Sequence, residues 1–470
     1  MDSINRRIKS LNRFLPQTNP WLILMASVPV ALATGTLFVY SVYATQLAEK
    51  CHLDTSQTAN LNISSTIGTA VGGIMSGLIA DAYGSQIPML FSCFSLTLGY
   101  NWLYHLFELG SLANLLALES AMFFVGFGSS SGYFSSLKAV TVSFPEFKGS
   151  AQSITIASFA ISSLIFLNIA TRIFKGDVAG FLFFLSIISG VTTMTGFVFV
   201  RFNGHLDETG EHLSLIEEAR EELEIINSSS RNDLRNMDIN GSVCHPIFWY
   251  HYFIFTFIQG FGQMYIYSIG FILKAINRYY SDEFDALSLG GLQALHVSLI
   301  AVSSFAGRLS AGPLSDFFVR KLKCQRHWIL ILGVSIMFVG HFLILRSINK
   351  TAGNLHEANT YLLISSVLIG YAYGFSFTGF PAIISDIFNM KNYSFIWGLM
   401  YSSTIFGLTL MTKLFGIVYD SNSGEHDGEY VCTKGSECYN YTFKITSYLC
   451  LFVIILLLGY IWKHSLAHHR

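Results

Sequence analysis

Charged side chains are scarce in this chain of 470 residues. Only 12% of its residues are Asp, Glu, Lys or Arg, and 52% are hydrophobic, with a mean hydropathy of +0.48. An ordinary soluble domain carries about a quarter charged residues, so this composition excludes one. The 28 basic and 29 acidic residues nearly cancel, and no overall charge predicts nucleic acid as a partner. The composition instead indicates a protein of the lipid bilayer.

The usual motifs of catalysis and cofactor binding are also missing. The sequence contains no nucleophile elbow, no paired-histidine metal motif and no Walker loop. It therefore predicts no enzyme, no metal site and no cofactor. It shows no lipidation or retention signal. The first apolar stretch, from Trp21, is too long for a secretory signal peptide and lacks a small-residue cleavage site.

The chain does contain twelve apolar runs, each long enough to cross about 30 Å of hydrocarbon, which takes about 20 helical residues. They lie near 21–46, 61–81, 88–107, 114–141, 150–172, 179–200, 246–276, 293–318, 328–346, 361–388, 395–418 and 443–463. We therefore predict an all-α polytopic membrane protein with twelve transmembrane helices in two six-helix halves. The predicted segments are an N-terminal segment (1–20), the first half (21–200), a polar linker (201–245), the second half (246–463) and a tail (464–470).

The positions of lysine and arginine predict the orientation in the membrane. Basic residues gather before the first span, in the central gap and after the eighth span, and the opposite loops carry roughly half as many. Because cytosolic loops carry the excess of Lys and Arg, both termini are expected in the cytosol. Plasma membrane and vacuole-type membranes both fit. The residues counted are Arg6, Arg7, Lys9, Arg13, Arg201, Arg220, Arg231, Arg235, Arg320, Lys321, Lys323 and Arg326.

The outer loops carry features that suit an oxidising or lumenal compartment. Cys432 and Cys438 lie in the loop before the last span, where a disulfide can form. Acceptor sequons for N-glycosylation begin at Asn440 in that loop and at Asn349 after the ninth span. We predict the disulfide and glycosylation on this side. The alternative is two free thiols and chance sequons.

One short motif occurs twice. GLIADAYG runs from Gly77 to Gly84, and GPLSDFFV begins at Gly312; each has an aspartate, Asp81 or Asp316, four residues after its first glycine. The two glycines are 235 residues apart (77 to 312), half of the chain, which indicates an internal repeat. A glycine lets a neighbouring helix approach closely, and a carboxylate can face the N-terminus of another helix. The alternative is that Gly and Asp merely end a helix.

This motif resembles the Gly-x-x-x-Asp-Arg-x-Gly signature of the major facilitator superfamily. The first copy departs from it, with Ala82, Ser85 and Gln86 where the family usually has basic residues. The resemblance implies two six-helix halves and a role for the motif in switching between inward-open and outward-open states. Further stretches resemble the nodulin-like and monocarboxylate-porter-like branch, of the kind found in fungi. These stretches are TGTLFVYSVYATQLAEKCHLD, FPEFKGSA and GIVYD with the cysteines after it.

A substrate cavity is expected near the bilayer midplane between the halves, and the resemblance implies that the first, fourth, seventh and tenth spans line it. Polar residues at that depth are the candidate substrate contacts, since an unpaired amide in hydrocarbon costs several kcal/mol. For each one, the alternative is a polar tie between helices. The candidates are Thr36, Tyr40, Ser129, Ser130, Tyr133, Gln259, Gln263, Tyr371, Tyr373 and Thr378.

Charged side chains inside the spans are rarer and therefore more informative. An Arg or Lys at the bilayer centre costs about 2.5–3.5 kcal/mol on insertion scales. Arg308 lies deepest and is the predicted anion contact, holding a carboxylate through two parallel hydrogen bonds. The alternative is that it pairs with Asp316 or with helix-end carbonyls. Lys138 and Glu119 lie near opposite ends of the fourth span and are expected to reach water.

The leading hypothesis is a secondary transporter of small organic anions, such as a monocarboxylate, by alternating access. Without an ATP-binding segment, concentrative transport needs an ion gradient, and Glu119 or His296 could carry a co-transported proton. We expect a monomer in the bilayer. The alternative is a non-transporting membrane sensor or scaffold on the same fold, favoured by the bases missing around Asp81. A third hypothesis is a membrane-embedded enzyme.

Overall fold

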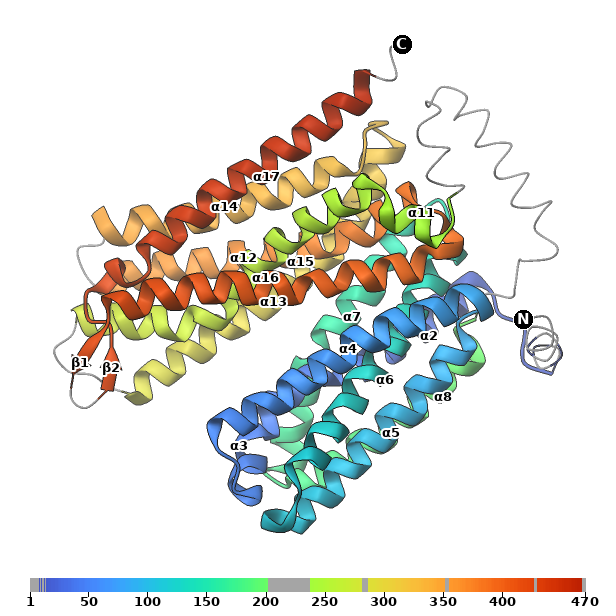
Figure 1. Ribbon diagram of the computed structural model, residues 1–470, viewed down its shortest axis with the longest axis horizontal. Coiled ribbons are helices and arrows are strands. Elements are labelled where there is room, and N and C mark those ends of the chain that lie inside the picture. The colour runs from blue at the N-terminus through green and yellow to red at the C-terminus, as the bar shows by residue number, and fades with distance from the viewer. Residues whose placement is uncertain are drawn as a thin grey trace. The chain divides into compact units, whose positions relative to one another are not determined.

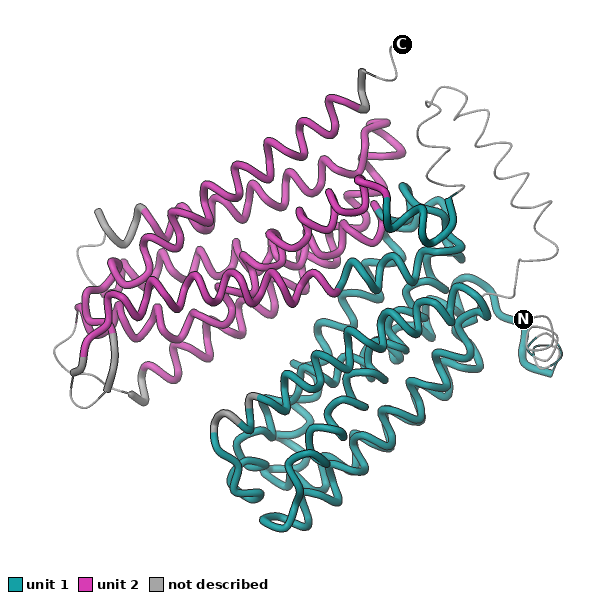
Figure 2. Tube along the Cα trace, viewed as in Figure 1, with its two compact units in different colours: residues 1–244, 384–401 teal, residues 245–383, 402–470 magenta. Residues whose placement is uncertain are grey.

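The computed structural model describes residues 8, 10, 12, 14–201, 237–280, 286–350, 355–426 and 429–466. Nearly all of them are helical (Figure 1). They form two compact units: Met1–Cys244 with Ile384–Tyr401, and His245–Ile383 with Ser402–Arg470 (Figure 2). The division lies at the end of the predicted linker, most of which falls outside the described residues. A short stretch of the second half, Ile384–Tyr401, belongs with the first unit.

Unit 1 holds the six long helices of the first half. The first is broken by a 3-10 turn. The elements are α2 (Pro20–Thr34), η1 (Gly35–Val39), α3 (Tyr40–Cys51), α4 (Thr55–Tyr83), α5 (Gln86–Leu109), η2 (Gly110–Leu112), α6 (Leu115–Ser143), α7 (Lys148–Ile169), η3 (Ala170–Phe174), α8 (Val178–Phe199) and α11 (Ile239–Cys244).

Side-chain caps fix where several of these helices start. The Asn19 side chain accepts from the Leu22 backbone N–H at 2.7 Å, one residue before the proline that opens α2. Asp54 and Gln57 form a reciprocal capping box at the start of α4. Each cap satisfies N–H groups that a helix leaves without a partner. Caps therefore set the beginnings of helices whose lengths are set by the apolar runs.

Unit 2 contains the helices of the second half and one small hairpin. The elements of the second half are α12 (Pro246–Tyr280), α13 (Ala286–Arg320), α14 (His327–Lys350), α15 (Leu355–Ile387), η4 (Met390–Asn392), α16 (Tyr393–Asn422), β1 (Gly424–His426), β2 (Glu429–Val431), η5 (Gly435–Cys438) and α17 (Asn440–Leu466). Of these, η4 lies in unit 1, and α15 and α16 are divided between the units. β1 and β2 pair antiparallel, Glu425 opposite Tyr430. Cys432 and Cys438 form a disulfide directly after this hairpin.

The two units use the same close helix crossing. In unit 1, a Cβ at Gly126 on α6 would overlap the Ser65 carbonyl of α4. In unit 2, a Cβ at Gly374 on α15 would overlap the Ser304 carbonyl of α13. These are the second and fourth long helices of each half, so the crossing occurs at corresponding places. Small residues let helix backbones approach in this way, and the internal repeat seen in the sequence extends to packing.

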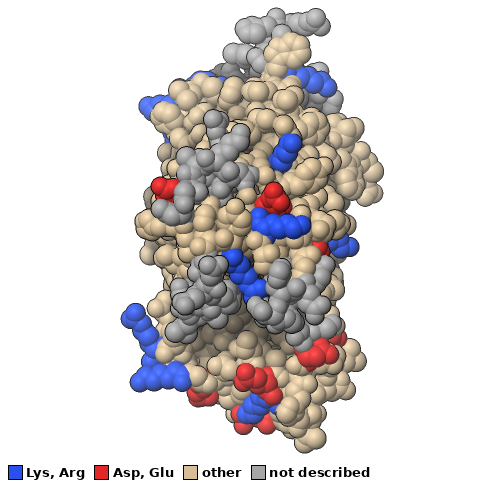
Figure 3. All heavy atoms as spheres, turned by 90° about the vertical axis from the view of Figure 1, so that its left-hand side faces the viewer, with Lys and Arg blue, Asp and Glu red and all other residues tan. Residues whose placement is uncertain are grey.

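The long helices suit a bilayer. Within the described part of the chain there are twelve, counting α2 to α3 as one, and ten are long and apolar enough to span a membrane by composition. The other two, α5 and α12, have 24 and 35 residues. The mean hydropathy of α5 and α12 is lowered by uncharged or weakly charged residues, namely Tyr, Trp, His, Asn and Gln. On the face in Figure 3, charged side chains are few among uncharged ones. The fold is the predicted twelve-helix one.

Candidate functional site

Arg308 is a buried cation on α13, with a relative exposure of 7%. Its guanidinium lies over the ring of Phe377 at 4.5 Å from the centroid and near Tyr373 at 5.7 Å, both on α15. Its Nε is buried without a hydrogen-bond partner. Among the described residues Arg308 forms no ion pair. Aromatic faces attract a cation, but they leave its hydrogen-bond donors unused.

The alternative pairing of Arg308 with Asp316 is wrong. Asp316 accepts from Arg326 at 2.8 Å, and both side chains are buried. Arg326 comes directly before α14 and also donates to Ser315. Arg326 therefore neutralises Asp316, and the charge of Arg308 is not offset by that carboxylate.

Gln259 on α12 shares a helix face with residues that contact the same two rings. Phe255, Gln259 and Gly262 are spaced as i, i+4 and i+7 and share one side of the helix. Phe255 packs on Phe377, with centroids 5.9 Å apart, and Gly262 lies against the ring of Tyr373. Gln259 lies between these contacts. Its side chain is fully buried, and neither amide atom has a hydrogen-bond partner in the part of the chain that is described.

The other predicted residues of unit 2 differ in how their polar groups are used. Gln263, one turn after Gln259, is half-buried, and its Oε1 has no partner among the described residues. The Tyr371 hydroxyl shares a hydrogen bond with Ser310 at 2.7 Å and so ties α15 to α13. The Thr378 hydroxyl donates to its own helix at Gly374. Arg308, Gln259 and Gln263 are the members of this set with buried polar atoms that lack a hydrogen-bond partner among the described residues.

The predicted residues of unit 1 mostly tie helices together. The Tyr40 hydroxyl donates to the Thr58 carbonyl at 2.8 Å. Tyr133 is buried and stacks on Phe159, with centroids 4.3 Å apart. The hydroxyls of Thr36, Ser129 and Ser130 all bond neighbouring groups. For Tyr40, Thr36, Ser129 and Ser130 the hydroxyl hydrogen bonds match the alternative given for each, a tie within or between helices.

Asp81 joins three elements at the end of α4. Its carboxylate accepts from the backbone N–H groups of Ser394 and Phe395, the first turn of α16, at 3.1 and 2.9 Å. It also pairs with Lys138 of α6, and both side chains are 5% exposed. The expectation that Lys138 reaches water is therefore wrong, since the carboxylate of Asp81 and the Ala80 carbonyl hold it inside the bundle.

Glycine occupies the positions of the motif for different structural reasons. A Cβ at Gly77 would come within 2.6 Å of the Ser394 carbonyl, so α4 and the start of α16 meet there. Gly84 ends α4 with φ of 87°, a conformation that favours glycine. Gly312 is buried in α13. The first copy of the motif thus combines close approach, helix termination and a carboxylate at a helix N-terminus.

The two candidate proton carriers lie in different surroundings. Glu119 is half-buried in the second turn of α6. His296 is fully buried on α13 and bonds Ser366 of α15 at 2.7 Å. Across the described ranges, no cluster of three His, Cys, Asp or Glu side chains could hold a metal ion.

Of the predicted glycosylation sites, Asn440 begins α17 half-buried, beside a buried Thr442. The Asn349 side chain lies outside the described ones.

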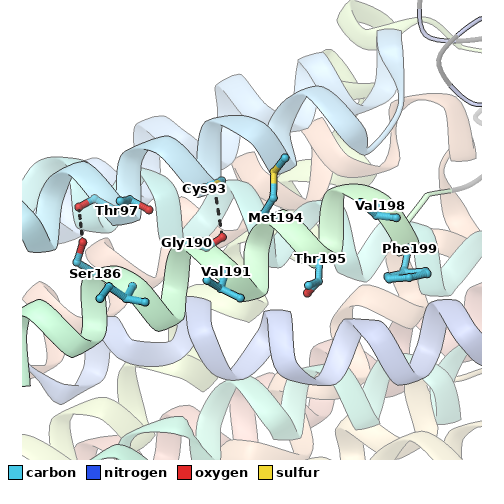
Figure 4. A pocket seen from close by; sticks show the side chains of 10 residues that line it. Cys93, Thr97, Ser186, Gly190, Val191, Met194, Thr195, Val198 and Phe199 are labelled. Carbon is cyan, nitrogen blue, oxygen red and sulfur yellow. Dashed lines mark hydrogen bonds between the residues drawn. The ribbon is translucent and has the colours of Figure 1, made fainter. Parts of the chain in front are cut away.

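A groove of about 500 Å³ runs between α5 and α8 (Figure 4). Two of its polar groups bond backbone carbonyls: Ser186 donates to the Thr97 carbonyl at 3.0 Å and Cys93 to the Gly190 carbonyl at 3.4 Å. Val191 on its wall is 56% exposed. These features suit contact with lipid chains better than a polar solute.

Comparison with known proteins agrees with this architecture. Residues 20–219 match the family model Nodulin-like, and residues 288–470 match that of the Major Facilitator Superfamily. The chain is 26% identical to the Probable transporter MCH1 of Debaryomyces hansenii, over 92% of this chain and 90% of that protein. It is 25% identical to an uncharacterized membrane protein of Saccharomyces cerevisiae, over 92% of each.

Two solved structures share the fold. The proton:xylose symporter XylE, bound to 6-bromo-6-deoxy-D-glucose, has a TM-score of 0.65 at 12% identity, covering 94% of this chain and 96% of that chain. FucP in the outward conformation has a TM-score of 0.54 at 15% identity, covering 92% and 98%. The two family matches indicate a transporter rather than an enzyme. The chain belongs to the major facilitator superfamily of multi-pass membrane transporters, with a nodulin-like first half.

Proposed function

We propose that this protein is a secondary transporter of small organic anions, such as monocarboxylates, by alternating access, and that Arg308 contacts the anion. The observation that carries the proposal is a buried guanidinium with no carboxylate partner among the described residues. The fold itself hosts many substrates. The choice of an anion therefore depends on this residue.

The energetics favour an anionic ligand beside Arg308. A buried charge is costly unless it is paired and hydrogen-bonded. The faces of Phe377 and Tyr373 offset about 0.5–2 kcal/mol of that cost, and they leave the planar fork of N–H donors unused. A carboxylate fits this fork through two parallel hydrogen bonds.

Gln259 adds neutral donors and acceptors to the same place. Its amide is unpartnered among the described residues, and Gln259 shares a helix face with Phe255 and Gly262, which contact the two rings beside Arg308. Small-molecule sites typically combine apolar and aromatic walls with a few polar groups that fix orientation. A small carboxylate with a hydroxyl or keto group matches one guanidinium, one or two amides and aromatic walls.

The sensor or scaffold alternative loses its main support. That alternative depended on the bases missing around Asp81, which suggested an inactive switch. Lys138 supplies the missing cation from α6, in direct contact with Asp81. The switch is chemically complete although the charge lies elsewhere in the sequence, and we propose that it stabilises one state of the transport cycle.

Arg308 variants test the proposal. Arg308→Lys keeps the charge but loses the planar pair of donors, so uptake should fall at least about tenfold, equivalent to about 1.4 kcal/mol. Arg308→Gln should abolish it, because no charge remains to hold an anion in a low-dielectric site. The measurement is uptake of radiolabelled monocarboxylates into proteoliposomes at matched protein content.

Two further variants act as controls. Tyr371→Phe breaks the hydrogen bond to Ser310 between the same helices and should leave anion selectivity unchanged. Arg308→Gln combined with Asp316→Asn should not recover transport, since Asp316 pairs with Arg326. Recovery in that double variant, or normal anion uptake by Arg308→Gln, would contradict the substrate role.

A further inference from the structure

The groove between α5 and α8 has a floor of small residues and apolar walls (Figure 4). A Cβ at Gly190 of α8 would overlap the Thr97 side chain of α5, so the two helices approach closely along the floor. Ile187 and Val191 stand beside this floor and are 49% and 56% exposed. An exposed apolar groove on two membrane-spanning helices is expected to face lipid.

The dimensions of the groove suit a single hydrocarbon chain. Along α8 it extends from Ser186 to Phe199, the last residue of the helix. A volume of about 500 Å³ over the helical rise of about 20 Å from residue 186 to residue 199 gives a cross-section of about 25 Å². A helix about 10 Å wide has a cross-section of about 80 Å². The groove is therefore too narrow for a helix from a second copy of the chain.

The groove covers one leaflet rather than the whole membrane. The hydrocarbon core is about 30 Å thick, so each leaflet contributes about 15 Å. A groove about 20 Å long that ends at the last residue of α8 reaches from that membrane surface to about the midplane. In the predicted orientation α8 ends in the cytosol. The groove thus suits an acyl chain of a lipid whose headgroup lies at the cytosolic surface.

A buried polar group without a partner lies at this end of the groove. Gln86, Cys93 and Thr97 are spaced as i, i+7 and i+11, so they share one face of α5. Gln86 is 4% exposed, and its Nε2 has no hydrogen-bond partner among the described residues. The Ser85 hydroxyl donates to the Val200 carbonyl at 2.7 Å and holds the start of α5 against the end of α8. The Gln86 amide is therefore an unused donor at the cytosolic end of the groove.

Arg201, which follows Val200 directly, adds a charge at the same end. Its side chain is 2% exposed and donates to the Asn12 side chain at 3.0 Å and to the carbonyls of Asn12 and Pro16. These acceptors are neutral, and Nε is buried without a partner. Arg201 forms no ion pair with any residue that the structure describes. Its positive charge is therefore solvated but not cancelled, and it attracts an anion to this end.

We propose that this groove binds an anionic phospholipid of the cytosolic leaflet, with one acyl chain in the groove and the phosphate at the end marked by Gln86 and Arg201. The Gln86 amide donates to a phosphate oxygen, and the Arg201 charge favours a lipid with net negative charge. Anionic lipids of the cytosolic leaflet attract basic side chains near the membrane surface. The site is separate from the proposed substrate site, since Arg308 belongs to unit 2, and it does not depend on what is transported.

Native mass spectrometry of the full chain in detergent tests the proposal, with palmitoyl-oleoyl phosphatidylserine and the matching phosphatidylcholine as probes. The wild type should bind one phosphatidylserine about fivefold more tightly than phosphatidylcholine, the effect of one basic residue near an anionic surface. Val191→Trp should lose this site, because the indole occupies the groove. Val339→Trp is the matched control, since Val339 is an exposed valine (45%) on α14 of unit 2, and it should bind as the wild type does.

Arg201→Gln separates the effect of the charge from that of the groove. This variant should still bind one lipid, but phosphatidylserine and phosphatidylcholine equally, because the chain keeps its place while the charge is gone. The retained binding also shows that the variant is folded. Arg320→Gln removes a cation from the end of α13 in unit 2 and should leave the preference for phosphatidylserine unchanged.

A phosphatidylserine that carries a diazirine in its acyl chain locates the site. Its photoproducts should map to α5 and α8, and they should disappear in Val191→Trp but not in Val339→Trp. The inference is overturned by equal affinity of the wild type for the two lipids, by a preference that survives in Arg201→Gln, or by labelling confined to other helices. A wild-type dimer that Val191→Trp dissociates would also overturn it, since the groove would then hold a second copy.

Discussion

At the scale of single residues, the informative groups are those whose hydrogen-bonding atoms are left unused inside the protein. Gln259 and Gln152 show the contrast, because both are fully buried glutamines. The Gln152 amide donates to Thr141 at 2.7 Å and to Tyr393 at 3.0 Å. The Gln259 amide has no described partner. Gln152 ties helices together, whereas we propose that the Gln259 amide meets a ligand.

This contrast gives a stability prediction. Gln259→Met removes an unsatisfied buried amide at similar volume, so it should raise the free energy of unfolding by about 1–3 kcal/mol. The same change should weaken anion binding. Gln152→Met should instead lower stability by a similar amount. Thermal unfolding in detergent, read with and without a monocarboxylate, measures both effects; a lower melting temperature for Gln259→Met would show that the amide has a structural partner.

At this scale the sequence indicates how deep a side chain lies in its span, but not which groups it contacts. Arg308 could be selected because a cation so far from either end of its span cannot reach water. Tyr40, Thr36 and Ser129 looked equivalent to Gln259 because the sequence gives depth alone. Whether a hydroxyl meets a neighbouring carbonyl depends on helix rotation, which the sequence does not encode locally. Phe377 could have been noticed, since it lies one turn after Tyr373 on the same face.

At the scale of elements, Asp81 connects α4 with α6 and with the start of α16. It neutralises Lys138 and accepts from two N–H groups at the positive end of a helix. Nothing in the sequence indicated that Lys138 was the partner, because 57 residues separate the two side chains. The missing bases beside Asp81 were a property of the local motif, and the fold supplies the charge from another helix.

The buried pair of Asp81 and Lys138 predicts that single and double substitutions differ in their effect on stability. Lys138→Met leaves Asp81 buried without its cation and should cost about 3–5 kcal/mol of stability, while Lys138→Met with Asp81→Asn should recover most of that loss. Thermal unfolding of the two single variants and the double variant checks this. Equal losses that simply add in the double variant would show that the two side chains do not act as a pair.

Asp81→Asn also tests the switching role. Removing a charge at a helix N-terminus is worth about 0.3–1 kcal/mol at an exposed site and more where the carboxylate is buried, as Asp81 is, so the ratio of inward-open to outward-open forms should change by at least about twofold. Alkylation rates of single cysteines placed on the two sides report that ratio. Anion affinity within one locked state should barely change. Lost binding with unchanged alkylation rates would contradict a role in switching.

At the scale of the whole molecule, composition and periodicity were sufficient for the twelve-helix architecture. The repeat was visible as two glycine–aspartate motifs, and it appears again as the paired crossings of α4 with α6 and of α13 with α15. Boundaries were less predictable where structure departs from simple periodicity. The first span contains a 3-10 turn at Gly35–Val39, and Ile384–Tyr401 groups with the first unit.

Orientation remains a prediction at this scale. With both termini in the cytosol, glycosylation should occur at Asn349 or Asn440 and should be absent from Asn227, which begins a further sequon in the predicted cytosolic linker. Of these, Asn349 is the better candidate, since Thr442 of the other sequon is buried. Gel mobility before and after removal of glycans, with each asparagine changed to Gln, is the measurement. A glycan at Asn227 would show that the predicted orientation is wrong.

The central claim is that the protein carries small organic anions, and counterflow in proteoliposomes tests it most directly. A panel should pair each radiolabelled monocarboxylate with its neutral amide, for instance lactate with lactamide, so that size and shape stay nearly constant while the charge is removed. The account predicts exchange of one or more carboxylates, no exchange of the matching amides, and loss of carboxylate exchange in Arg308→Gln. Equal exchange of an amide and its acid, or exchange that survives in Arg308→Gln, would contradict it.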